Sequence, residues 1–229
     1  MDMTGIVERL QTSALFGNAS PESLELVARN LRPRRFRRNE VVFHEGDPGD
    51  SLHLVTSGAL KTVLVGADGD EAIIATLRAG DFFGELALLD GAPRSATVVS
   101  LESSETWSLP RATLRELLDK DPALRDALLA GLARELRRLT RQVEELHFLD
   151  LAGRLAMRLA RLAREVDPTG EGVELDWPYT QSDLAAMIGA TRQSVNKLLA
   201  DLVDRGLVTV SQDTLLIPDV DALEREAAR

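Results

Sequence analysis

The chain has 229 residues, of which 44% are hydrophobic and 28% charged, and its net charge of −10 does not favour nucleic-acid binding. Cysteine is absent and the three histidines lack metal-ligand spacing, so disulfides, protein-built metal sites and cysteine nucleophiles have no support. Without an export signal or an apolar run of membrane-spanning length, the sequence predicts a cytoplasmic globular protein of two modest domains with no membrane segment.

The first part of the chain changes from a short helix to a series of strands. Ser20 can cap a helix whose first turn holds Pro21, and this helix should end near Pro33. From about Arg34 to Leu109, β-branched clusters alternate with glycine-rich turns, which is typical of a compact antiparallel roll or barrel. The clusters cover residues 41–43, 52–55, 62–65, 72–75 and 97–99.

Helical patterns replace the strands from Arg111 onwards. A short helix to Lys120 precedes a long one that begins at Pro122, in which apolar residues alternate spacings of three and four. This spacing predicts the heptad seam of a two-stranded coiled coil and hence a homodimer through residues 122–146. The alternative is a helix that packs the same stripe onto its own domain. The seam consists of Leu129, Leu132, Leu136, Leu139, Val143 and Leu146.

The long helix is followed by an interruption and then by another helix. Phe148, Leu149 and Asp150 break the polar pattern and predict a hinge, and Asp150 can cap a helix that runs to about Val166. Residues 167–172 have the turn-rich composition of a connector.

Two short helices joined by a glycine turn are predicted near the C-terminus. Thr180 and Asp183 resemble a capping box that opens the first helix. Gly189 makes the turn, and Thr191 can cap the second helix. This arrangement is typical of a helix-turn-helix, whose second helix can enter the major groove of DNA.

The segment after the second helix predicts a wing. Gly206 should end the helix, and strands at 207–210 and 214–217 would form a hairpin around residues 212–213. From residue 176 to residue 229 there are five basic against nine acidic side chains, a net charge of −4. DNA binding here must therefore depend on the local placement of a few cations.

The segment from Phe83 to Thr97 carries the strongest site signal. Gly84 permits close approach of the backbone, and a helix starting near Glu85 would present N–H groups to an anion. Arg94 supplies the planar fork that suits a phosphate, and Glu85 can accept a sugar hydroxyl. For either side chain alone, an ordinary salt bridge between Glu85 and Arg94 is the alternative.

This segment resembles the phosphate-binding cassette of the cyclic-nucleotide-binding domain. The whole chain resembles the family of bacterial transcription factors that contains the cyclic-AMP receptor protein (catabolite activator protein) and the fumarate-nitrate reduction regulator. The resemblance implies an α+β fold with a cyclic-nucleotide-binding β-roll (1–120), a dimerisation helix and hinge (121–149) and a winged helix-turn-helix domain (150–229). It implies a homodimer, not an enzyme, that binds double-stranded DNA under the control of cAMP or cGMP, uses no metal and contacts RNA polymerase.

The resemblance also assigns ligand contacts. Gly84 and Arg94 would meet the cyclic phosphate, and Glu85 the ribose 2′-hydroxyl. The position that usually holds a polar adenine contact is Leu139 here, so the choice between cAMP and cGMP stays open. The implied ligand residues are Gly84, Glu85, Leu86, Ala87, Arg94, Ser95, Leu139 and Thr140.

The second helix of the helix-turn-helix should read the DNA sequence. Arg192 can bond guanine and Gln193 adenine, while Lys197 suits a phosphate or a base edge. Relatives often have Glu after the Arg, so a shifted DNA site is expected. The arginines at 32–38 and 154–164 are expected to lie on solvated faces or to make acidic contacts between domains rather than to bind DNA. The implied DNA contacts are Thr180, Thr191, Arg192, Gln193, Ser194 and Lys197.

Two rival functions remain. The first is a ligand-independent DNA-binding regulator in which the roll is only a dimerisation scaffold and Arg94 pairs with Glu85. The second is a redox or haem sensor of the same family, which the absence of Cys and of a suitably placed His disfavours.

Overall fold

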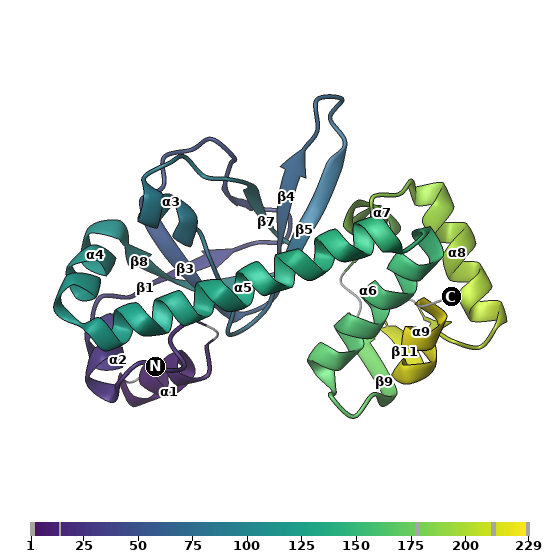
Figure 1. The fold of residues 1–229 in the computed structure, drawn as a ribbon. Coiled ribbons are helices and arrows are strands. Elements are labelled where there is room, and N and C mark those ends of the chain that lie inside the picture. Colours follow the sequence, from purple (N-terminus) through teal and green to yellow (C-terminus); the bar gives the residue numbers. More distant parts are fainter. Residues whose placement is uncertain (1–2, 14, 177–178, 212–213, 228–229) are drawn as a thin grey trace. The chain divides into compact units, whose positions relative to one another are not determined.

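The computed structural model describes residues 3–13, 15–176, 179–211 and 214–227 (Figure 1). The chain divides into two compact units, residues 1–138 and 139–229, and the division falls within the long helix α5 (Pro122–Phe148). Helices and mainly antiparallel sheets occur in each unit, as the predicted α+β class requires. None of the helices in the described ranges is long and apolar enough to cross a membrane.

Two four-stranded antiparallel sheets form the β-roll of the first unit (Figure 1). Val55 and Phe83 from one sheet pack with Leu60 and Val98 from the other, and all four side chains are buried. The five predicted strand clusters are confirmed as β2, β3, β4, β5 and β7. The first sheet has the order β1 (Arg32–Phe36), β8 (Ser104–Pro110), β3 (Ser51–Ser57), β6 (Phe82–Phe83), and the second the order β2 (Val41–Phe43), β7 (Thr97–Ser100), β4 (Leu60–Val65), β5 (Glu71–Leu77).

The first predicted helix is confirmed but ends earlier than expected. In α2 (Pro21–Ala28) the Ser20 hydroxyl caps the helix by accepting the N–H of Ser23 at 3.2 Å. The chain then enters β1, which contains Pro33. Because β1 lies at the edge of its sheet, the missing N–H of a proline can be tolerated there.

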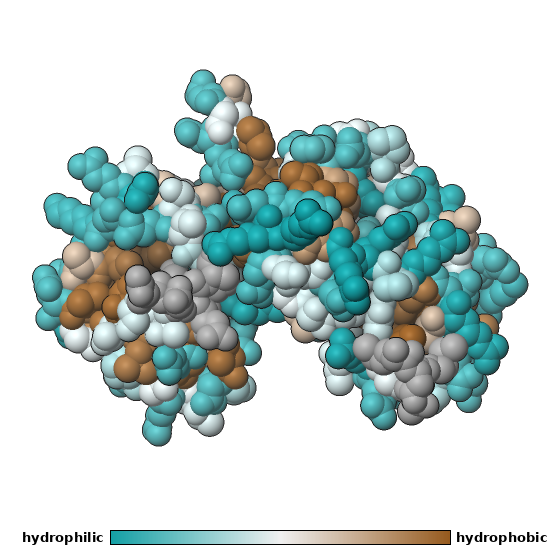
Figure 2. Space-filling view, turned by 180° about the vertical axis from the view of Figure 1, so that it is seen from behind, coloured by the Kyte–Doolittle hydropathy of each residue, from teal (hydrophilic) through white to brown (hydrophobic). Residues whose placement is uncertain are grey.

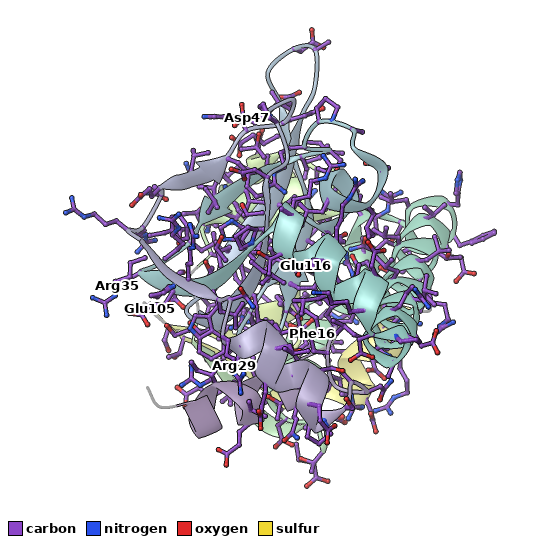
Figure 3. All side chains as sticks on the ribbon, turned by 90° about the vertical axis from the view of Figure 1, so that its left-hand side faces the viewer. Phe16, Arg29, Arg35, Asp47, Glu105 and Glu116 are labelled. Carbon is purple, nitrogen blue, oxygen red and sulfur yellow. The ribbon has the colours of Figure 1, made fainter. Side chains whose placement is uncertain are left out.

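A second core lies between the first sheet and the helices of this unit. The helices are α1 (Met3–Gln11), which the sequence did not predict, α2, α4 (Arg111–Lys120) and the start of α5. Phe16, labelled in Figure 3, is fully buried in this core together with Leu52 of β3. Each such side chain stabilises the fold by roughly 1.5–3 kcal/mol. The helices therefore fix the back of β3, whose other face bears the candidate site.

The heptad seam of α5 is largely exposed. Leu132 packs on the second core, but Leu129, Val143 and Leu146 are more than half exposed and the exposed fraction of Leu136 is 66%. The alternative in which the stripe packs on its own domain is therefore wrong for these four residues. Figure 2 shows the hydropathy of one face of the molecule, on which brown apolar patches interrupt a largely polar surface. An exposed apolar stripe such as the α5 seam is what a helix-helix partner would cover.

A break between helices lies at the predicted hinge residues. Helix α5 ends at Phe148, and the carboxylate of Asp150 caps α6 (Leu151–Val166) by accepting the Gly153 N–H at 2.8 Å. The second unit continues with β9 (Glu171–Asp176), α7 (Gln181–Ile188), α8 (Arg192–Asp204), β10 (Thr209–Val210), β11 (Thr214–Asp219) and α9 (Val220–Ala227).

The wing has one more strand than predicted. Strands β10 and β11 pair as expected, while the turn residues Gln212 and Asp213 lie outside the described residues. The expectation that the connector runs to Gly172 is wrong, because Gly172 lies in β9, which pairs with β11. Val173 and Leu175 alternate along the strand and are both buried. As a strand, this segment buries two apolar side chains that a turn would leave exposed.

Candidate functional site

The predicted anion-binding helix is present after β6. Helix α3 (Glu85–Asp90) begins at Gly84, whose φ of +82° is left-handed, and no side chain caps it within the described chain. A Cβ at position 84 would lie 2.5 Å from Nη1 of Arg94, so glycine is required for space as well as for backbone conformation. The glycine thus brings the start of α3 against the guanidinium.

Arg94 is buried, with only 4% of its surface exposed. Its Nη1 donates to the carbonyl oxygen of Gly84 at 2.8 Å, and its Nη2 donates to the carbonyl oxygen of Ser51 at 2.8 Å. The buried Nε has no hydrogen-bond partner among the described residues. A buried donor without a partner is costly, so an acceptor from outside the chain would stabilise this atom.

The backbone and the guanidinium plane of Arg94 are both fixed. The N–H of Arg94 donates to the carbonyl oxygen of Asp47 at 2.9 Å, and the N–H of Gly46 donates to that of Arg94 at 2.9 Å. Asp47 is labelled in the loop region of Figure 3. The Cζ of Arg94 lies 4.1 Å from the centre of the Phe43 ring, a cation-π contact.

The ion pair of Arg94 differs from the one in the scaffold hypothesis. Within 4.0 Å, Arg94 pairs with the exposed carboxylate of Asp50, at 3.6 Å, and not with Glu85. Burial raises the pKa of the Glu85 carboxyl, and its own backbone N–H and the charge of Arg94 only partly offset this effect. A partly desolvated carboxyl without a close cation suits a hydroxyl donor.

The other implied ligand residues are spread over two elements. In and after α3, Ala87 is buried, whereas Leu86 and Ser95 are exposed. Leu139 and Thr140 lie on α5 within the second unit, and both are exposed. Leu86, Ala87 and Ser95 are near Gly84 and Arg94 in the chain. The base contacts of Leu139 and Thr140 stay a prediction.

The helix-turn-helix has the predicted caps. The Thr180 hydroxyl accepts the Asp183 N–H at 3.1 Å, and the Asp183 carboxylate accepts the Thr180 N–H at 2.8 Å. Gly189 ends α7 in a left-handed conformation, and Thr191 caps α8 by accepting the Ser194 N–H at 3.2 Å. The two hydroxyl caps orient the starts of both helices.

One face of α8 is polar and free of the core. Arg192, Gln193 and Lys197 are exposed, whereas Val195 and Leu199 are buried. The side chains predicted to read DNA therefore share the outer face near the start of the helix.

The arginines of α6 are engaged within the second unit. Arg154 donates to the carbonyl oxygens of Leu146 at 2.7 Å and Leu149 at 3.0 Å, and Arg161 forms an ion pair with Glu145. The further contacts join Arg164 to Asp221 and Glu224, and Arg158 to the sulfur of Met187. In the roll, Arg35 of β1 forms an ion pair with Glu105 of β8 at 2.8 Å, and both residues are labelled in Figure 3.

The sequence did not indicate the residues behind Arg94. Ser51 and His53 of β3 and Phe43 of β2 contact it or one another. The alternation of Ser51, His53 and Val55 in β3 could have placed them on one face, but not beside Arg94. No group of three His, Asp or Glu that could hold a metal occurs in the part of the chain that the structure describes.

The chain combines a β-roll, in which the Arg94 guanidinium is buried beside the start of α3, with a winged helix-turn-helix. This combination is that of an effector-binding, DNA-binding regulator. The cyclic nucleotide-binding domain model matches residues 33–121, and the Crp-like helix-turn-helix domain model matches residues 153–226. The CRP-like cAMP-activated global transcriptional regulator of Mycobacterium tuberculosis (strain ATCC 25618 / H37Rv) is 33% identical over 221 residues, 96% of this chain and 99% of that protein. The chain belongs to the CRP/FNR family of transcription regulators.

Further similar proteins agree in length and fold. The cyclic AMP receptor protein of Thermus thermophilus is 30% identical over 218 residues, 95% of this chain and 98% of that protein. The structure of FixK2 from Bradyrhizobium japonicum has a TM-score of 0.78 and 21% identity, and covers 86% of this chain and 96% of its own. The FixK2 likeness shows the fold alone.

Proposed function

We propose that the chain is a homodimeric, sequence-specific transcription regulator whose DNA affinity is controlled by a cyclic mononucleotide, cAMP first and cGMP second. The observation that carries the effector is Arg94, which is buried beside Gly84 and retains an Nε without a partner among the described residues. A bidentate guanidinium next to helix N–H groups is suited to a singly charged cyclic phosphate.

Within this proposal each cassette residue has a distinct role. Arg94, Ser95 and the amides of Leu86 and Ala87 bind the phosphate oxygens, and Gly84 leaves room for them. Glu85, the first residue of α3, accepts the ribose 2′-hydroxyl with a carboxylate oxygen.

The base is the less constrained end of the ligand. Relatives at 33% and 30% identity are named for cAMP, which supports cAMP here. Leu139 offers no hydrogen bond to a base, so only Thr140 would contribute one from this pair. We therefore place cAMP first and keep cGMP as the second effector.

Dimerisation connects the effector to DNA. The exposed seam of α5 supports a homodimer through residues 122–146, with residues 148–150 as the hinge. Thus residues 1–120 form the sensor, 121–149 the dimer helix and hinge, and 150–229 the DNA-binding domain. The effector would set the two recognition helices about 34 Å apart, one turn of DNA.

DNA contacts follow from the exposed face of the helix-turn-helix. Arg192 and Gln193 read base edges, Lys197 binds a phosphate or a base, and the hydroxyls of Thr180, Thr191 and Ser194 lie near the backbone of the duplex. Such a regulator acts where the DNA is, in the cytoplasm, by binding rather than by catalysis. RNA polymerase is its further partner by family resemblance.

Calorimetry on the full-length wild type with cAMP, cGMP and cyclic dinucleotides tests the effector. We expect one cyclic mononucleotide per subunit, and a thermal shift equivalent to about 2.7 kcal/mol at 100 times Kd. Arg94→Ala should abolish binding, and Arg94→Lys should restore little of it because lysine lacks the planar fork. If the wild type binds none of these ligands, or Arg94→Ala binds as well as the wild type, the proposal fails.

A further inference from the structure

A chain of polar groups runs through the roll interior behind Arg94. The Ser51 hydroxyl donates to the Asp50 carboxylate at 2.8 Å and accepts from Nη2 of Arg94 at 3.4 Å. Its oxygen also lies 3.2 Å from Nε2 of His53, and Nδ1 of His53 lies 3.1 Å from the Thr106 hydroxyl. The chain therefore ends at the guanidinium that would bind the phosphate.

The positions of the hydrogens follow from counting donors. The single hydrogen of the Ser51 hydroxyl is used on Asp50, so its oxygen can only accept from Arg94 and His53. Nε2 of His53 must then carry the ring hydrogen. In a neutral imidazole Nδ1 is the acceptor, so the Thr106 hydroxyl donates to it.

The imidazole is held neutral and fixed in place. His53 is 6% exposed, and burial together with the charge of Arg94 lowers its pKa to about 4. Its ring stacks on Phe83 with centres 5.0 Å apart, and Phe83 in turn packs against Phe43, the ring beneath Arg94. Both the polar chain and the aromatic stack thus lead from His53 to Arg94.

We propose that His53, acting through the Ser51 hydroxyl, is a positioning residue for Arg94 in the effector site. The Nε2–H of His53 turns the Ser51 hydroxyl so that its hydrogen points to Asp50 and its lone pair faces Nη2. Arg94 then keeps its orientation while Nε stays available for the ligand. This inference rests on the proposed function, since it concerns the phosphate end of the same site.

Two variants separate the polar chain from the aromatic stack. His53→Phe keeps a ring but removes both nitrogens, and His53→Gln keeps a donor near Nε2 but removes the ring. By calorimetry on the full-length protein, His53→Phe should bind cAMP about three- to tenfold more weakly, the loss of one hydrogen bond. His53→Gln should recover most of this affinity. Both effects should be equal for cAMP and cGMP, because the chain acts on the phosphate and not on the base.

Ser51→Ala removes the hydroxyl between His53 and Arg94 and is a smaller change than His53→Phe. It provides the test if His53→Phe does not fold. Its loss of affinity should match that of His53→Phe, and the double variant should bind no more weakly than the weaker single one. Ser104→Ala is the matched control, because Ser104 is buried on β8 and bonds the carbonyl oxygens of Ala59 and Glu102 instead. It should bind cAMP like the wild type.

The outcomes are distinct. Wild-type affinity in both His53→Phe and Ser51→Ala, or losses that multiply in the double variant, would overturn the positioning role while leaving the effector site intact. A wild type that binds neither cAMP nor cGMP would instead refute the proposed function, and the positioning role with it.

Discussion

Arg94 shows the cost to folding of burying a guanidinium with one donor unpaired among the described residues. Its burial removes water from the guanidinium, and two backbone carbonyls replace only part of that hydration. A buried donor without a partner costs roughly 1–3 kcal/mol, and such atoms are rare in folded proteins. If the proposed effector binds at Nε, it offsets this cost, and effector binding and stability are then coupled at this residue.

Gly84→Ala should disrupt the site through sterics as well as backbone strain. The added Cβ would lie 2.5 Å from Nη1 of Arg94 and displace it, so cAMP binding measured by calorimetry should be lost. Gly69→Ala is the control, because Gly69 has a similar φ of +85° but nothing within 4 Å of its Cβ. Both variants should lose about 1–2 kcal/mol of stability from the left-handed backbone. Equal cAMP affinity in the two would argue against close contact at Gly84.

His53 should make stability fall in acid. Its pKa is about 4 in the folded state, lowered by burial and by Arg94 and Arg34, with Asp50 opposing, and 6.5 when unfolded. The unfolded chain therefore takes up the proton first, and about 3 kcal/mol of stability present above pH 6.5 is lost as the pH falls to about 4.

The difference between the wild type and His53→Phe isolates this effect. Burial raises the pKa of the Asp81 and Glu85 carboxyls. The folded state therefore takes up their protons first, and this stabilises the fold as the pH falls, opposite to the effect of His53. Denaturant titrations of both proteins from pH 7 to pH 4 should show the smaller decline in His53→Phe. A pH-independent difference would mean that His53 is not titrated in this window.

Elements with their own start signals were predictable from the sequence, and elements that depend on distant partners were not. Capping residues indicated α2, α7 and α8, and heptad spacing indicated α5. Strand β9 was missed because Gly170 and Gly172 suggested a turn, whereas β11 supplies its hydrogen bonds. Helix α9 was missed because its stability depends on burying Val220 and Leu223, and it packs against α6, which lies far away in the sequence. Short helices of this kind are stabilised by tertiary contacts rather than by propensity.

Leu136→Asp should separate the dimer. It places a charge in the middle of the exposed α5 seam, where an unpaired buried charge is strongly destabilising. Light scattering on the full chain should report monomers, and specific DNA affinity should fall. Arg141→Asp, on the same helix but outside the seam, should remain dimeric. A dimer in Leu136→Asp would move the interface elsewhere.

Gln193→Glu should change the DNA sequence that α8 selects. An amide can both donate to and accept from adenine, whereas a carboxylate only accepts and favours the amino group of cytosine. Selection from randomised half-sites should shift one base pair from adenine towards cytosine. Gln181→Glu, the same change at the start of α7, is the matched control and should select the same half-site as the wild type. The same half-site from Gln193→Glu and the wild type would show that Gln193 does not touch a base edge.

Across the whole molecule, the candidate site joins segments that no local pattern connects. Gly84 and Arg94 lie ten residues apart, so their shared role was predictable from one motif. Ser51 lies 43 residues before Arg94, and its contact depends on how β3 pairs with β6 and β8. The proximity of Gly84 and Arg94 was therefore predictable from sequence, while the contact of Arg94 with Ser51 required the sheet.

Effector and DNA should strengthen each other's binding by the same factor. Thermodynamic linkage requires this reciprocity, and typical coupling lies at about 5- to 150-fold. Fluorescence anisotropy of a DNA site with and without cAMP gives one factor, and calorimetry of cAMP with and without that DNA gives the other. Unequal factors would indicate that one ligand also changes the state of association.

The internal pairing of the α6 arginines has a consequence for how the regulator finds its site. Each phosphate neutralised by a cation contributes about −0.9 to the slope of log affinity against log salt. Arg154, Arg161 and Arg164 are held by groups of their own unit, so fewer of the described cations are left to hold random duplex. The protein should therefore adhere poorly to non-target DNA and search the chromosome mainly by release and recapture, rather than by long slides along the double helix.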